Sequence, residues 1–361
     1  MMEGAIDIRH VARTLSLVEN RRPEAQSVLR DAYAMARRIP VVGVTGPPGA
    51  GKSTLLDRLA LHWAEKGERV VVIAVDPSSP FTGGAVLGDR FRMDRASAHP
   101  RVFVRSLSSR GQVGGLSRAV QDVVTVVAAL NFDRVIVETV GSGQADVEVA
   151  TLADCVVVVS VPGLGDQLQA GKAGILEIGD IYAVNKRDLP GADTVAGHLN
   201  ANLDLIYLGQ PGINEPSQAQ GHGALNANAA LRRRHGCAAE QLPFWRPPVV
   251  KVSGTDGAGV EMLGNAVDDF IGWQRESGRE GGRRAEWLQG HILRLASGRL
   301  LAQSLPENAA CSLSKLAESV KQGGMTPYQA AGCLLDALFI AWQEQSETTK
   351  DVPARDETPR F

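Results

Sequence analysis

The 361-residue sequence has few cysteines and no excess of charge of either sign. Its four cysteines, at positions 155, 237, 311 and 333, are far apart and form no CxxC pair. This spacing argues against a disulfide framework and against a zinc site built from thiolates. The 38 basic and 40 acidic residues give a net charge of −2. The total charge therefore gives no reason to expect nucleic acid or a membrane surface as a partner.

Long apolar runs and targeting signals are also missing from the sequence. No apolar segment reaches the roughly 18 residues that a membrane-spanning helix needs. Residues 1–20 lack the basic start and the following apolar run of a secretory signal, and the early acidic residues Glu3 and Asp7 are unlike a mitochondrial transit peptide. We therefore expect a cytoplasmic protein that binds neither a membrane nor nucleic acid.

Seven short runs rich in valine and isoleucine predict buried strands. The runs are continuous rather than alternating, which is typical of parallel strands covered by helices on both faces. Helical patterns fall between them, for example at 52–67 and 116–131. This order predicts an α/β fold with a doubly wound, mostly parallel sheet, in which ligands bind at the carboxyl ends of the strands. The predicted strands are 41–45, 69–76, 101–104, 134–138, 155–161, 181–185 and 249–253.

Four regions are predicted along the chain. Residues 1–39 form an N-terminal helical extension, 40–275 the α/β domain, 276–345 a C-terminal helical arm and 346–361 a disordered tail. Within the domain, 209–246 is predicted to be a long, partly irregular insertion. The basic run LRRRHG inside it, at 231–236, is interpreted as a solvated loop.

The sequence GPPGAGKST follows the first predicted strand and precedes a helix. It matches the pattern G-x-x-x-x-G-K-[ST] of P-loop NTPases in the required context, which disfavours the alternative of a glycine-rich turn without a ligand. Backbone N–H groups and the helix N-terminus would bind a β-phosphate. We expect Lys52 to span the β- and γ-phosphates, Ser53 to ligate Mg²⁺ and Thr54 to contact the α-phosphate. The predicted loop comprises Gly46, Pro47, Pro48, Gly49, Ala50, Gly51, Lys52, Ser53 and Thr54.

The sixth predicted strand ends in NKRD, residues 185–188. An acidic side chain at Asp188 can accept hydrogen bonds from both N1–H and the exocyclic amine of guanine, whereas adenine offers no such pair of donors. Lys186 would lie along the base plane and Asn185 would brace the loop. The backbone of Ser253 and Gly254, in SGTDG after the last strand, is predicted to contact the guanine oxygen. These residues favour GTP and GDP over ATP.

The fourth predicted strand, RVIVE, ends in Glu138 and runs into a glycine-rich turn. Alone, this pattern also fits an ordinary surface loop after a core strand. Beside a P-loop, nucleotide hydrolases keep an acid for magnesium, and Glu138 is predicted to be that acid. Gly141 would present its N–H to the γ-phosphate, and Gln144 is a candidate for orienting the attacking water.

A further candidate loop follows the second predicted strand, at 76–93. It contains Asp76 at the strand end and Asp89 beyond a Gly-Gly pair. Taken alone, it is a polar loop with a helix cap. Next to a nucleotide, Asp76 and Asp89 would lie near the metal and Arg90 or Arg92 near phosphate.

GPPGAGKST, VDPSSPFTGGAVLGDRFRM, VETVGSGQAD and NKRD, in this order and spacing, resemble the MeaB/ArgK family of P-loop GTPases. The resemblance is close over 40–275 and looser beyond. It implies a chaperone of adenosylcobalamin-dependent acyl-CoA mutases, such as methylmalonyl-CoA mutase. It also implies a homodimer held by the C-terminal helical arm, and GTP hydrolysis that gates cofactor loading and protects or rescues the mutase.

Two departures from the family pattern bear on the partner. Asp146 stands where a glutamate is usual. The segment 162–180 resembles the family's third switch, but Gln167 and Ala173 replace one acidic and one basic residue, which leaves Asp166 and Lys172. The partner could therefore be methylmalonyl-CoA mutase or a related isobutyryl-, hydroxyisobutyryl- or ethylmalonyl-CoA mutase.

Two other functions were weighed. A nickel-delivery GTPase needs a cluster of cysteine and histidine, and only His235 and Cys237 lie close together in the sequence, which we interpret as chance. An ATP-using kinase of amino-acid transport is disfavoured by Asp188.

Overall fold

A computed structural model describes residues 6–20, 22–35, 37–76, 93–108, 115–139, 152–163, 178–207, 235 and 244–280, with single residues at 282, 289, 292, 315, 319 and 333. The chain divides into two compact units, Met1–Trp287 and Leu288–Phe361. All the elements below belong to the first unit. The predicted domain boundaries and the predicted helical arm stay predictions.

The first unit contains a seven-stranded sheet in which every neighbouring pair is parallel. The strand order is β3-β2-β4-β1-β5-β6-β7. All seven predicted strands are confirmed. Their bounds are β1 Val41–Thr45, β2 Val70–Asp76, β3 Val102–Ser108, β4 Arg134–Thr139, β5 Cys155–Ser160, β6 Ile181–Val184 and β7 Val249–Lys251.

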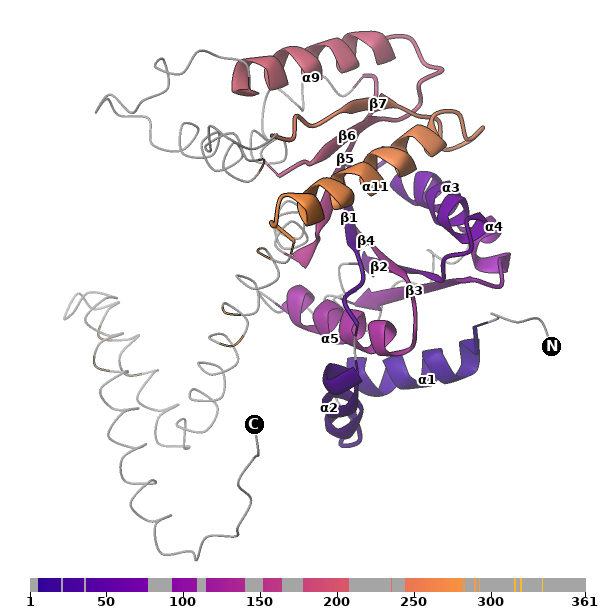
Figure 1. Cartoon of the computed structure of the whole chain (residues 1–361), viewed down its shortest axis with the longest axis vertical. Coiled ribbons are helices and arrows are strands. Elements are labelled where there is room, and N and C mark those ends of the chain that lie inside the picture. Colours follow the sequence, from indigo (N-terminus) through magenta and orange to yellow (C-terminus); the bar gives the residue numbers. More distant parts are fainter. Residues whose placement is uncertain are drawn as a thin grey trace, which may run out of the picture. The chain divides into compact units, whose positions relative to one another are not determined.

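Helices cover both faces of the sheet (Figure 1). On one face lie α3 Lys52–Glu65, α4 Asp94–Ala98 and α11 Val260–Glu276, which pack on alternate strand residues in one apolar core. On the other face lies α5 Gly115–Ala129, and α9 Ala192–Tyr207 packs against β6 and β7. Because both faces are covered, strands β1, β4, β5 and β6 are buried along their whole length.

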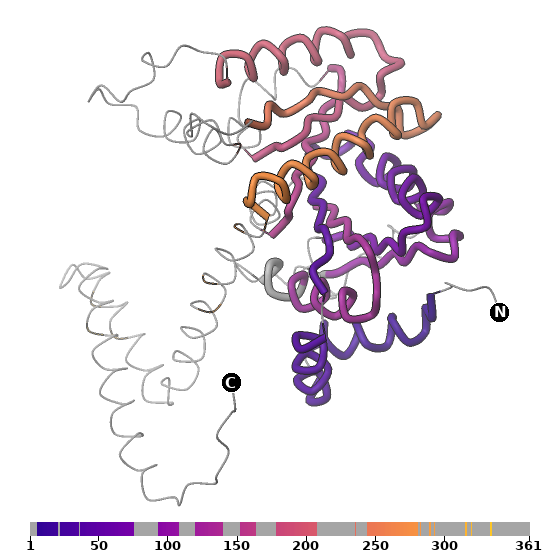
Figure 2. Tube along the Cα trace, in the orientation of Figure 1, coloured from indigo at the N-terminus to yellow at the C-terminus, as the bar shows by residue number. Residues whose placement is uncertain are grey.

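The N-terminal residues form two helices, α1 Ile8–Glu19 and α2 Ala25–Met35, which pack on α5 (Figure 2). The break between them contains Pro23, which cannot donate a helical hydrogen bond. Asp7 caps α1 by accepting from the backbone N–H groups of Arg9 and His10 at 3.1 and 3.0 Å. The prediction of a helical N-terminal segment is confirmed.

Strand β3 is longer than predicted, because it continues through polar residues. Arg105 interrupts the apolar run, yet its guanidinium donates to Ser16 Oγ at 3.1 Å and pairs with Glu19 on α1 at 2.5 Å. Residues of α1 therefore satisfy the Arg105 guanidinium, so the edge strand can continue past this charged side chain.

The strand order determines which strand ends lie together at the edge of the sheet where ligands are expected. The chain runs from central β1 outward to β2 and β3, returns to β4 beside β1, and then continues through β5 to β7 on the other side. The carboxyl ends of β1, β4, β6 and β7 lie at one edge of the parallel sheet, where ligands of such folds bind. Among the described helices, none is both long and apolar enough to cross a membrane.

Candidate functional site

The loop between β1 and α3 has the backbone shape that its glycines predict. Gly46, Gly49 and Gly51 have φ values of +148°, +75° and +79°. A Cβ at Gly46 would lie 2.2 Å from Val159 O, and one at Gly51 would lie 2.6 Å from Asn185 Nδ2. At Gly49 no heavy atom lies within 4 Å of a built Cβ. The loop is therefore packed against protein at both ends and open at its tip, which is the shape an anion-binding loop requires.

Lys52 is held against this loop. Its Nζ donates to Gly46 O at 2.9 Å and to Pro47 O at 3.1 Å, and the residue is buried. It is the first residue of α3, so its ammonium lies at the same helix N-terminus as the loop amides. A positive charge and a helix N-terminus together favour a bound anion.

Two predicted metal ligands are brought together beside the loop. Strands β1 and β4 pair so that Val44 lies opposite Glu138, and Ser53 Oγ donates to Glu138 Oε1 at 2.7 Å. A hydroxyl and a carboxylate next to a phosphate loop form a suitable oxygen donor set for Mg²⁺, which binds few protein ligands and completes its shell with phosphate and water. Within the described ranges, no group of three or more His, Cys, Asp or Glu is placed to hold a metal. The residues present fit Mg²⁺ only with a nucleotide beside it.

Of the other residues predicted for the metal and the γ-phosphate, the structure describes only the backbone of Asp76. Asp76 ends β2, whose residue Val75 lies opposite Thr139, so its backbone is at the same edge as Glu138. Asp89, Gly141 and Gln144 lie outside the described residues.

The residues predicted for the base adjoin the P-loop. Asn185 Nδ2 donates to Ala50 O at 2.8 Å, and Lys186 Nζ donates to Gly49 O at 3.1 Å. Lys186 has a φ of +57°, an unusual conformation for a residue with a side chain and one that clusters at functional sites. Asp188 is exposed, so its carboxylate can discriminate between bases only when a bound base covers it.

Ser253 and Gly254, predicted to contact the guanine oxygen, begin the loop after β7. The Ser253 N–H donates to Ala258 O at 2.8 Å, and the Gly254 N–H donates to Asn185 Oδ1 at 3.0 Å. Both N–H groups are therefore engaged inside the protein, and their contact with a guanine oxygen stays a prediction. Gly254 also joins the loop after β7 to Asn185, which contacts the P-loop.

The loop after β7, residues 253–259, is stabilised by its own polar groups; we call it the base loop. The Ala258 N–H donates to Asp256 Oδ1 at 2.8 Å. This hydrogen bond, followed by one with the Ser253 side chain, holds the pKa of the Asp256 carboxyl below its ordinary value of 3.8, and Arg187 and Arg58 act in the same direction. Arg58, on α3, also donates to Thr255 O. No sequence motif marks Arg58.

His235 is the one described residue of 231–236, and at this position the expectation of a solvated loop was wrong. This histidine is completely buried, with Nε2 2.7 Å from Asp180 Oδ1 and Nδ1 in contact with the Tyr207 hydroxyl. Both ring nitrogens are engaged by protein groups, so His235 is a structural residue rather than an available metal ligand. Cys237, its neighbour in the sequence, lies outside the described residues.

The family model for the methylmalonyl-CoA mutase-associated GTPase MeaB matches residues 11–309. The chain belongs to this family. It is therefore a GTPase, an enzyme that binds and hydrolyses GTP, as the sequence predicts. The prediction that the P-loop and NKRD act on a guanine nucleotide, rather than ATP, agrees with this assignment.

Relatives match between 77% and 92% of the chain. A putative GTPase of Pyrococcus abyssi is 39% identical over 92% of this chain and 94% of its own length. The GTPase ArgK of Escherichia coli is 34% identical over 77% of this chain and 78% of its own. The mitochondrial methylmalonic aciduria type A homolog of Caenorhabditis elegans is 30% identical over 91% and 79%.

A crystal structure of a LAO/AO transport system kinase matches with a TM-score of 0.57 and 24% identity, over 91% of this chain and 93% of that one. At this identity the match supports the fold alone.

Proposed function

We propose that this GTPase binds Mg²⁺ together with GTP at the carboxyl edge of its sheet and uses hydrolysis to control an adenosylcobalamin-dependent acyl-CoA mutase. The observation that carries the proposal is the hydrogen bond of 2.7 Å between Ser53 and Glu138. It joins the residue after the P-loop lysine to the acid at the end of the adjacent strand. A serine and an acid in this arrangement form the magnesium side of a nucleotide hydrolase site.

The phosphate side is assigned from the contacts of the loop. Lys52, which now lies on the carbonyls of Gly46 and Pro47, would move its hydrogen bonds to the β- and γ-phosphates. The backbone N–H groups of the loop from Gly49 to Thr54 would bind the α- and β-phosphates. Ser53 and Glu138 would hold Mg²⁺, with Asp76 and Asp89 as further candidates, and the ion would neutralise charge that develops on the phosphate oxygens.

Guanine specificity is assigned to Asp188. The exposed carboxylate would accept N1–H and the amine of guanine, while Lys186 would cover a face of the base. Gly141 at the γ-phosphate and Gln144 at the attacking water complete the proposed site. The sequence shows no arginine finger supplied by the chain itself, so we expect slow hydrolysis until a partner accelerates it.

Replacement of Glu138 tests the metal side. For Glu138→Gln we expect slower single-turnover hydrolysis with GTP still bound, because an amide is a weaker Mg²⁺ ligand than a carboxylate. Glu68→Gln is the matched control, because Glu68 pairs with Arg134 at 2.7 Å at the other end of β4. An unchanged single-turnover rate in Glu138→Gln would remove this residue from the mechanism.

The partner is proposed from the family. The family description names methylmalonyl-CoA mutase, and the sequence resembles chaperones that gate adenosylcobalamin loading and protect or reactivate such a mutase. The altered third switch, with Gln167 and Ala173, leaves isobutyryl-, hydroxyisobutyryl- and ethylmalonyl-CoA mutases as alternatives. A homodimer held by residues 276–345 is part of the same proposal.

Copurification with candidate mutases tests the partner. The tagged chain should retain one of these mutases, with GTP and GDP giving different amounts, and should change the rate at which adenosylcobalamin enters it. Equal, background-level retention of all four mutases in both nucleotide states would refute the chaperone proposal while leaving the GTPase activity intact.

A further inference from the structure

Arg58 connects the P-loop helix to the base loop. It lies in α3, six residues after Lys52, and its guanidinium donates to Thr255 O. The same guanidinium lies against Gly257, where a built Cβ would be 3.0 Å from Nη1 and 3.5 Å from Cζ. Gly257 has a φ of +87°, so a side chain there would be strained as well as crowded. The base loop is thus shaped to receive this guanidinium.

The base loop contacts α3 at a second point, one helical turn earlier. A Cβ at Gly254 would lie 3.0 Å from Leu55 N and 3.2 Å from Thr54 C, so the two backbones are in direct contact. Contacts to Thr54 and Leu55 and the hydrogen bond from Arg58 therefore hold the loop on the same side of one helix. Because α3 begins at the phosphate loop, the helix sets the distance between the phosphate side and the base side of the site.

We propose that Arg58 is a positioning residue that fixes the base loop on α3 and thereby slows release of the guanine nucleotide. The inference rests on the proposed placement of the nucleotide between the P-loop and NKRD. Arg58 does not touch the reacting phosphate in this account. Its loss lets the base loop move away from the base, while Lys52, Ser53 and Glu138 keep their contacts with one another and with the P-loop.

The charge around Arg58 supports a role in holding the loop. Its hydrogen bond to a carbonyl is charge-assisted, and such bonds are stronger than neutral ones. The hydrogen bond from the Ala258 N–H makes the largest contribution to the lowered pKa of the Asp256 carboxyl. The positive charges of Arg187 and Arg58 lower this pKa further. Loss of Arg58 therefore removes one direct contact and one favourable charge from the same loop.

Three variants of the full chain separate this role from general effects. Arg58→Met removes the hydrogen-bond donors but keeps an unbranched aliphatic side chain. Arg58→Lys restores a donor and a positive charge. Arg101→Met is the matched control, because Arg101 donates to Gly67 O at 2.9 Å just beyond the other end of the same helix. Each variant is measured for GDP dissociation, for single-turnover hydrolysis at saturating GTP, and for melting temperature.

We expect GDP to leave Arg58→Met about tenfold faster than the wild type, the effect of losing one charge-assisted hydrogen bond. The single-turnover rate at saturating GTP should stay within about twofold, since the phosphate side is intact. Arg58→Lys should recover most of the slow release, and Arg101→Met should release GDP at the wild-type rate.

Three results would overturn the inference. The first is GDP release from Arg58→Met at the wild-type rate, and the second is GDP release from Arg101→Met that is accelerated as much as from Arg58→Met. The third is a fall in the single-turnover hydrolysis rate of Arg58→Met together with its nucleotide affinity. Failure of the proposed nucleotide site would look different, because Lys52→Ala would then bind GDP as tightly as the wild type.

Discussion

The two ends of the same parallel strands are built from different interactions. At the carboxyl edge, side chains bond to loop backbone: Lys52 and Lys186 donate to P-loop carbonyls, and Asn185 joins the P-loop to Gly254. The P-loop contains three glycines with positive φ, namely Gly46, Gly49 and Gly51. This edge is held in shape by a few polar contacts that a ligand can replace.

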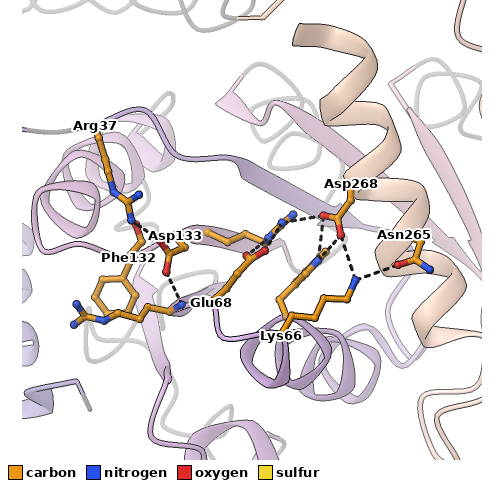
Figure 3. A network of polar contacts seen from close by, with 10 residues as sticks. Arg37, Lys66, Glu68, Phe132, Asp133, Asn265 and Asp268 are labelled. Atoms are coloured by element: carbon orange, nitrogen blue, oxygen red, sulfur yellow. Dashed lines mark hydrogen bonds and ion pairs between the residues drawn. The ribbon is translucent and has the colours of Figure 1, made fainter. Parts of the chain in front are cut away.

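At the amino edge, charged side chains bond to one another (Figure 3). Arg134 pairs with Glu68 at 2.7 Å and with Asp268 at 2.8 Å, and its guanidinium lies 4.1 Å from the ring centroid of Trp63. Asp268 of α11 also accepts from Trp63 Nε1 at 3.2 Å and lies 3.6 Å from Lys66 Nζ. These contacts join α3, β4 and α11 without any loop carbonyl.

The difference teaches where stability and function reside in this fold. Paired charges around a buried arginine stabilise the packing of helices on the sheet, whereas donors aimed at loop carbonyls at the opposite edge are available for phosphate and base. Substitutions at the carboxyl edge should therefore change nucleotide chemistry more than stability, and those at the amino edge should do the reverse.

The largest effect is expected for Lys52→Ala at the carboxyl edge. GTP turnover should fall by roughly 10²–10³-fold, as when one preorganised charge-stabilising donor is removed. The free energy of unfolding should change by no more than about 1 kcal/mol, because the cost of burying the ammonium offsets its two hydrogen bonds. Phosphate release and chemical denaturation measure the two quantities, and a large loss of stability with intact turnover would reverse the comparison.

Arg134→Ala is the corresponding test at the amino edge. Arg134 is 7% exposed and its partners Glu68 and Asp268 are 28% and 34% exposed. We expect a loss of about 2–3 kcal/mol of unfolding free energy, below the full cost of breaking a buried pair because the partners reach solvent. GDP affinity should not change. Arg37→Ala, at a pair with 51% and 33% exposure, is the control and should cost under about 1 kcal/mol.

A third prediction sharpens the comparison on the base side. Asp188→Asn should lower GTP affinity by roughly 100-fold and raise affinity for xanthosine triphosphate, since an amide can donate to the extra carbonyl of xanthine. Competition binding with both nucleotides measures the preference. Asp193→Asn is the matched control, because Asp193 pairs with Lys251 rather than a base. Retention of the GTP preference in Asp188→Asn would show that the base is bound elsewhere.

The smallest expected effect concerns pH and the amino edge. Burial alone would raise the pKa of the Asp133 carboxyl, but hydrogen bonds from the Arg69 N–H and the Arg37 guanidinium lower it below its ordinary value of 3.8. A lowered carboxyl pKa stabilises the fold above the unfolded-state value, and this stabilisation is lost as pH falls through the folded value. We expect no more than about 1 kcal/mol, because the site is open to solvent.

Denaturation of the wild type and Asp133→Asn across pH measures this contribution. The wild type should be more stable from about pH 5 to 7, and the difference should shrink as pH falls below 3.8 and vanish below the lower pKa of the folded state. A difference that persists at low pH would mean that ionisation of Asp133 is not its cause.

Much of the fold could be predicted because a covered parallel sheet requires apolar residues on both faces of each strand. This rule located all seven strands. The largest difference in bounds is at the end of β3, where Arg105 contacts α1 residues 86 and 89 positions away. A contact between segments so distant in the sequence leaves no local pattern.

The site was predictable to the extent that local motifs specify it. GPPGAGKST predicted the loop between β1 and α3, and the end of RVIVE predicted an acid at the same edge, where Glu138 contacts Ser53. The base-binding role of NKRD stays a prediction, although Asn185 and Lys186 contact the P-loop. The hydrogen bonds of the Ser253 and Gly254 N–H groups to Ala258 and Asn185 were not predicted, because only the fold brings these residues together. Arg58 and the buried His235 were missed for the same reason.

The most direct test of the account is a crystal structure of the chain with Mg²⁺ and a non-hydrolysable GTP analogue. We predict that one nucleotide contacts Lys52 with its phosphates and Asp188 with its base, and that Ser53 and Glu138 lie at the metal. A nucleotide bound away from these residues, or Glu138 and Asp188 facing different cavities, would contradict the account.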